Sequence, residues 1–120
     1  MDELLRDCLF PVMLGSNTLC HACVRQMQKR YGAASTVLTG KRALTLRFLP
    51  SVRVIDAPPT LSDELLREVL FDVGEESGFS LPLLVVCDER YDAFVARNRA
   101  EIEARFILRH AGDLLGEANR

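Results

Sequence analysis

Residues 83–87 (LLVVC) form an uninterrupted apolar run, and this run constrains the fold more than any other feature of the sequence. A strand in a one-sided sheet alternates apolar and polar residues, whereas a strand covered by helices on both faces is apolar at every position. The run is too short for a membrane-spanning helix, which needs about 20 apolar residues. It therefore predicts a central strand of a parallel sheet that lies between two layers of helices.

Two further strands and the helix between them predict the topology. Residues 10–14 (FPVML) predict a buried strand, and residues 35–38 (STVL) predict a second one. Between them, residues 18–30 place apolar side chains at helical spacing, with Asn17 as the N-cap and Gly32 as a left-handed C-cap. Strand, helix and strand joined by short connections make a βαβ unit, so these two strands are predicted to be parallel.

The second half of the chain continues the alternation. Residues 52–55 predict a short strand and residues 106–108 a last one, and a helix capped by Thr60 or Ser62 is expected to end at Gly74 or Gly78. The apolar stripe of that helix comprises Leu65, Leu66, Val69, Leu70 and Val73. Further helical turns are predicted through Phe94, Val95 and Ile102, and another element begins at Asp113, whereas residues 42–50 remain unassigned.

About five strands alternating with three or four helices predict an α/β fold, a Rossmann-like open parallel sheet with helices on both faces. The chain has 120 residues, 48% of them hydrophobic, and a formal net charge of -2, which fits one globular domain over residues 1–120. This charge gives no indication of nucleic-acid binding, and the start Met-Asp-Glu lacks the basic end of a signal peptide. We expect a cytoplasmic protein, with no membrane partner, whose four cysteines are reduced.

In open parallel sheets, ligands bind at the carboxyl ends of the strands, near the point where the strand order reverses. The loop after residues 10–14 offers a glycine turn and a helix N-terminus, which suit a carboxylate or phosphate. The loop after residues 83–87 gathers two carboxylates, a guanidinium and a phenol. The candidate substrate-binding residues are Gly15, Ser16, Asn17, Asp88, Glu89, Arg90 and Tyr91.

A simpler interpretation of both loops stays open. Gly15 can serve only as a turn, Asn17 only as a helix cap, and Arg90 can pair with its own neighbours. A third loop, residues 39–41, is expected at the same edge. The sequence has no Walker A loop, no G-x-G-x-x-G fingerprint and no triad pattern, so no catalytic residues are predicted.

The Cys20-His21-Ala22-Cys23 motif has two competing interpretations. A C-x-x-C pair at a helix start is typical of thioredoxin-like redox sites, and the proline at position 82 resembles another landmark of that fold. Against this, Cys20 lies one turn inside the predicted helix and on its apolar stripe, which favours buried, unbonded thiols. The motif supplies at most three ligands from one helix, so no metal site is predicted.

Two segments carry a family resemblance. Residues 10–17 (FPVMLGSN) precede a helix that ends in Tyr31-Gly32, and residues 90–106 contain R-Y-x-x-F-V-x-x-N-R-x-E-I-x-x-x-F. These segments resemble the N-terminal (pre-ATP-grasp) domain of ATP-grasp carboxylate–amine ligases, closest to D-aspartate ligases and carbamoyl-phosphate-synthase-like proteins. Asn17 stands where that family usually has an acidic residue, and Asp88-Glu89 replaces its Gly-Asp pair.

The resemblance implies a substrate-binding domain. In that family, ATP, Mg²⁺ and the acyl-phosphate chemistry belong to a later ATP-grasp domain, so this chain is expected to be a fragment of a longer ligase, inactive alone and without a cofactor of its own. The implied partners are that later domain and a small carboxylate or amino acid such as D-aspartate, with a homodimer left open. The alternative function is a stand-alone Rossmann-like small-molecule sensor or interaction module.

Overall fold

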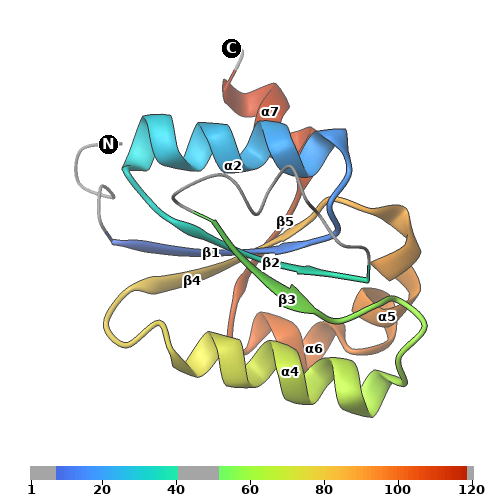
Figure 1. Cartoon of the computed structure of the whole chain (residues 1–120). Coiled ribbons are helices and arrows are strands. Elements are labelled where there is room, and N and C mark those ends of the chain that lie inside the picture. Colours follow the sequence, from blue (N-terminus) through green and yellow to red (C-terminus); the bar gives the residue numbers. More distant parts are fainter. Residues whose placement is uncertain (1–7, 41–51, 119–120) are drawn as a thin grey trace.

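A computed structural model describes residues 8–40 and 52–118 of the chain. Its strands are β1 (Leu9–Leu14), β2 (Ser35–Thr39), β3 (Val52–Asp56), β4 (Leu81–Val86) and β5 (Ile107–His110). In the described residues they form one five-stranded sheet in the order β3-β2-β1-β4-β5, and every pairing is parallel. The predicted Rossmann-like open parallel sheet is therefore confirmed (Figure 1).

Helices cover both faces of this sheet (Figure 1). One face carries α2 (Thr18–Tyr31) and α7 (Ala111–Ala118), and the other carries α4 (Asp63–Glu75), α5 (Asp92–Arg97) and α6 (Arg99–Glu103). Because side chains alternate along a strand, Met13 and Val85 join the core under α2 while Leu14 and Val86 join the core over α4. This two-sided burial explains why residues 83–87 are apolar at every position.

Three predicted helix caps, Asn17, Gly32 and Ser62, are confirmed. The side chain of Asn17 accepts a hydrogen bond from the N–H of Cys20 (3.1 Å), and Gly32 closes α2 in the left-handed conformation with φ at 66°. Ser62, the second of the two predicted caps, starts α4 by accepting a hydrogen bond from the N–H of Leu65 (3.3 Å). Cys20 and Cys23 are buried and form no disulfide, as predicted.

The end of α4 differs from the prediction. The helix runs to Glu75 and its C-cap is Glu76 in a right-handed conformation, so neither glycine terminates it. Gly74 lies in the last turn because the ring of Phe106 packs there, and an added Cβ would lie 2.6 Å from that ring. Leu65 belongs to the predicted apolar stripe, but 48% of it is exposed because it lies beside the face that contacts the sheet.

Other bounds of strands and helices also differ from the prediction. β4 begins at Leu81, before the predicted residue 83, because its first residues pair with the start of β1 and the N–H of Leu81 bonds the Cys8 carbonyl. β1, not β4, is the middle strand. β5 begins at Ile107 because Phe106 is used as a core side chain under α4, and the element expected from Asp113 is α7.

Residues 42–50, which the sequence leaves unassigned, and Lys41 of the third loop lie outside the described residues. Within the described ranges, none of the helices has the length and apolar character needed to cross a bilayer.

Hydrogen bonds and an ion pair connect the start of α4 to the junction of α5 and α6. The carboxylate of Asp63 accepts two hydrogen bonds from Arg97 (2.7 and 2.8 Å) and one from the amide of Asn98 (3.2 Å). The same amide donates to the Phe94 carbonyl (2.9 Å), which holds the bend between the two short helices. The hydrogen bonds from Arg97 lower the pKa of Asp63 to about 2.

This pKa predicts a defined acid sensitivity. Because the folded-state pKa of Asp63 lies below its unfolded value of about 3.9, its stabilising contribution is complete above that value and is lost as the pH falls toward 2. We expect Asp63→Asn to lower the free energy of unfolding at neutral pH, with the difference from wild type shrinking between pH 4 and pH 2, in urea titrations. Glu64→Gln, in the same helical turn, removes an exposed carboxylate and is the control for the loss of one negative charge at the start of α4.

Candidate functional site

The strand order reverses between β1 and β4, and the loops that leave these strands meet at their carboxyl ends. The carbonyl of Leu14, the last residue of β1, accepts hydrogen bonds from the N–H groups of Cys87 (3.0 Å) and Asp88 (3.1 Å). Residues 15–17 and 88–91 therefore lie side by side, as the sequence predicted. We define these seven residues as the carboxyl-edge site.

Gly15 makes the close approach of the two loops possible. It is buried, its φ is 111°, and its N–H donates to the Leu38 carbonyl (2.9 Å). A Cβ at this position would lie 2.4 Å from the Cβ of Asp88. Gly15 thus serves as a turn against Asp88, and the space beside it is filled by protein.

Asn17 joins α2 to β4. Its side-chain oxygen caps the N–H of Cys20, and its side-chain nitrogen donates to the carbonyl of Cys87 (2.8 Å). Both ends of the amide are therefore used within the protein. Asn17 positions the N-terminus of α2 at the edge of β4, which is a structural role in agreement with the simpler interpretation.

Asp88 and Arg90 form an ion pair in the carboxyl-edge site. The carboxylate of Asp88 accepts hydrogen bonds from Nη2 of Arg90 (2.7 Å), from its Nε (3.1 Å to Oδ2) and from its backbone N–H (3.0 Å). The hydrogen bonds to Asp88 raise the pKa of Arg90 above its ordinary value. The side chain of Asp88 is 10% exposed and that of Arg90 is 53% exposed. Arg90 is therefore not an isolated cation, although one side of it faces solvent.

Tyr91 points into the protein. It is 1% exposed, and its hydroxyl donates to the carbonyl of Ala57 in the loop after β3 (2.8 Å). Burial raises its pKa to about 12, so the phenol stays protonated at neutral pH. Tyr91 ties two loops together beneath the site, and it does not face a ligand.

The remaining residues of the predicted set are more accessible. The hydroxyl of Ser16 is 2.8 Å from that of Thr39, at the end of β2, and Glu89 is exposed. Thr39 was expected only as part of the third loop, and Cys87 was not expected near the site. Thr39 directly follows the predicted strand at residues 35–38, and Cys87 ends the predicted strand at residues 83–87. Their position at the carboxyl end of a strand is the signal that could have placed them at the carboxyl-edge site.

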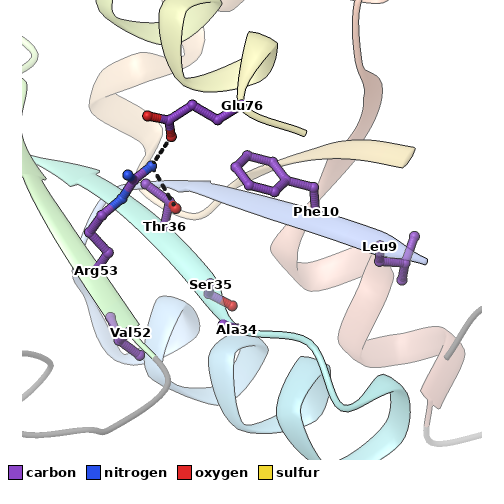
Figure 2. Close-up of a pocket in the computed structure, with 8 residues that line it drawn as sticks. All are labelled: Leu9, Phe10, Ala34, Ser35, Thr36, Val52, Arg53 and Glu76. Atoms are coloured by element: carbon purple, nitrogen blue, oxygen red, sulfur yellow. Dashed lines mark hydrogen bonds and ion pairs between the residues drawn. The ribbon is translucent and has the colours of Figure 1, made fainter. Parts of the chain in front are cut away.

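A pocket of about 420 Å³ lies at the opposite, amino edge of the sheet (Figure 2). Across it, Arg53 of β3 bonds both Thr36 and Glu76, and the side chain of Phe10 lies on the other side (Figure 2). The charges of this pocket are thus paired with each other over apolar walls. The carboxyl edge, where ligands of such sheets bind, is the stronger candidate.

Comparisons with protein-family models, with curated proteins and with solved structures return no match. In residues 8–40 and 52–118, no group of three or more His, Cys, Asp or Glu side chains is arranged to hold a metal ion. The carboxyl-edge site offers paired opposite charges, a hydroxyl and the N-terminus of α2, which together can bind and orient a small polar molecule.

The contact between Gly15 and Asp88 gives a stability prediction. Gly15→Ala should lower the free energy of unfolding by about 3 kcal/mol, because it combines an unfavourable positive φ with a clash against Asp88. Gly112→Ala is the control, since an added Cβ in α7 meets nothing within 4 Å. Urea unfolding should show the first variant well below wild type and the second equal or slightly above it. Equal stability of the two variants would contradict the close approach.

Proposed function

We propose that this domain binds a small amino-acid or carboxylate substrate at the carboxyl-edge site, as the substrate domain of an ATP-dependent carboxylate–amine ligase. The observation that carries the proposal is the Asp88–Arg90 charge pair at the switch point, beside the N-terminus of α2. The resemblance of residues 10–17 and 90–106 supports the same function independently.

The charge pair favours a zwitterion over a simple anion. A guanidinium has five N–H donors, and Asp88 takes those of Nε and one at Nη2, which leaves donors on the exposed side for a substrate carboxylate. N–H groups of the first turn of α2 that Asn17 does not cap can add to this interaction. The exposed carboxylate of Glu89 can accept hydrogen bonds from a substrate ammonium. An amino acid carries both groups, so it matches both halves of the site.

The position of the two resembling segments supports the ligase assignment. Residues 10–17 form β1 and the loop after it, and residues 90–106 run from the loop after β4 through α5 and α6. They therefore flank the switch point from both sides. In the proposed ligase this domain would orient the substrate, and a separate ATP-grasp domain would supply ATP and Mg²⁺. There the carboxylate would take up a phosphoryl group, and an amine would then displace phosphate to form the C–N bond.

Amide chemical shifts test the proposed binding. Titrating the ¹⁵N-labelled chain with D- and L-aspartate, other amino acids and simple dicarboxylates should shift residues 15–17 and 88–91 for at least one amino acid. Titration with Mg²⁺-ATP should leave those amides unchanged, because the chain has no phosphate-binding glycine loop. Shifts only with nucleotides would favour the alternative of a stand-alone sensor. No shift with any compound at millimolar concentration would contradict substrate binding by this domain.

The role of Arg90 gives a quantitative prediction. Arg90→Ala should weaken binding of the amino acid identified by titration about 10- to 150-fold, the effect of losing about 1.5–3 kcal/mol of charged hydrogen bonding. Calorimetry measures the change. Arg99→Ala is the matched control, because Arg99 is also exposed but pairs with Glu103 on α6. Equal affinities of the two variants would remove Arg90 from the site.

A further inference from the structure

The pocket at the amino edge of the sheet arises from the register of β1. This strand pairs with β4 from Leu9 onward, but it pairs with β2 only from Val12 to Leu14. Pro11, just before that pairing, has no N–H to contribute to a ladder. A space of about 420 Å³ therefore lies between the start of β1, the starts of β2 and β3, and the C-cap of α4. We call this space, lined by the eight residues labelled in Figure 2, the amino-edge pocket.

The hydroxyl of Ser35, in this pocket, has no partner in the protein. Ser35 is 3% exposed, and its Oγ is the one buried side-chain N or O atom without a hydrogen bond in residues 8–40 and 52–118. A buried polar group without a partner is rare in native proteins, because it has given up its hydrogen bonds to water. A serine side chain turns among three staggered positions, so this hydroxyl can turn toward a ligand without breaking a bond in the protein.

The charged groups of the pocket are bound to each other. Nη2 of Arg53 donates to the hydroxyl of Thr36 (3.3 Å) and to the carboxylate of Glu76. The hydrogen bond from Arg53 lowers the pKa of Glu76, which keeps this carboxylate ionised at neutral pH. One positive and one negative charge line the pocket, so its net charge is zero. An anion would compete with Glu76 for Arg53, and a cation would compete with Arg53 for Glu76, so the pocket favours an uncharged ligand.

The remaining walls are apolar. Leu9, Phe10 and Val52 supply most of this surface, and the Phe10 ring lies across the pocket from Arg53 (Figure 2). Pockets that bind small molecules are mostly apolar with a few polar groups that fix the orientation, and their volumes start at about 300 Å³. An aromatic ring in the ligand can pack against Phe10 in an offset or edge-to-face arrangement. The size and the walls thus suit a molecule with a single ring.

We propose that the amino-edge pocket binds a small uncharged molecule that consists of one aromatic ring and a carbonyl group, as in an aromatic amide. The ring packs against Phe10 and the neighbouring apolar walls, and the hydroxyl of Ser35 turns to donate a hydrogen bond to the carbonyl oxygen. Binding then supplies the partner that this hydroxyl lacks. The pocket lies at the opposite end of the strands from the carboxyl-edge site, so the inference does not depend on which ligand that site binds.

Titration of the ¹⁵N-labelled chain with benzamide and with benzoate tests this proposal. The two compounds have nearly the same shape, but benzoate carries a charge. Benzamide should shift the amides of residues 9, 10, 34–36, 52 and 53 with a dissociation constant in the millimolar range, as expected for a ligand of this size, and should leave residues 15–17 and 88–91 unchanged. Benzoate should bind more weakly, because Glu76 already occupies Arg53.

Ser35→Ala separates binding from stability. It should weaken benzamide binding about 3- to 10-fold, the effect of losing one uncharged hydrogen bond. The free energy of unfolding, from urea titrations, should be equal to that of wild type or higher, because the hydroxyl has no partner in the free protein. Ser80→Ala is the matched control, since Ser80 lies outside the pocket in the loop before β4, and it should leave the affinity unchanged.

Three results would overturn the proposal. The first is the absence of amide shifts around the pocket with benzamide at millimolar concentration, or shifts confined to the exposed Phe79 and its neighbours. The second is benzoate binding as tightly as benzamide, which would show that Arg53 selects an anion. The third is an unchanged affinity of Ser35→Ala, which would remove this hydroxyl from the site. The first two are measured on the wild-type chain, so they do not rely on a substitution in the sheet.

Discussion

Burial of β1 and β4 on both faces is the constraint on which the rest of this structure depends. A fully buried apolar side chain contributes about 1.5–3 kcal/mol, and these two strands supply such side chains to both cores at once. Helices must therefore cover both sides of the sheet, and the connections between parallel strands must cross from one edge to the other. Every strand then ends at the same edge, which places the loops after β1 and β4 next to each other.

The residues of the carboxyl-edge site fall into two groups, one with a structural role and one that faces solvent. Gly15, Asn17 and Tyr91 hold loops, strands and helices together, and their polar groups are used inside the protein. Ser16, Glu89 and Arg90 keep part of their surface toward solvent. A substitution in the first group should act mainly on stability, and one in the second mainly on binding. This division makes the two effects separable by experiment.

The sequence predicted most of the fold, because apolar runs and helix caps are local signals. The strands at residues 10–14 and 35–38, the Asn17 cap and the convergence of the two loops all follow from such signals and from general rules of parallel sheets. Contacts between side chains that the topology brings together could not be predicted. Arg90 is bound by Asp88, Tyr91 turns inward to the loop after β3, and Cys87 packs in the same core as Cys20 and Cys23. The substrate-binding role of the site remains a prediction.

The edges of the sheet carry a further consequence. Among residues 8–40 and 52–118, β3 and β5 each pair with a strand on one side only, and an edge strand with exposed backbone groups can add a strand from another chain. Each of these strands places an exposed arginine within it, Arg53 in β3 and Arg109 in β5. Arg53 is paired with Glu76, whereas pairing β5 with a copy of itself would bring the exposed Arg109 side chains close together. A charged residue in an edge strand opposes edge-to-edge pairing, and Arg109 therefore protects the β5 edge of the sheet.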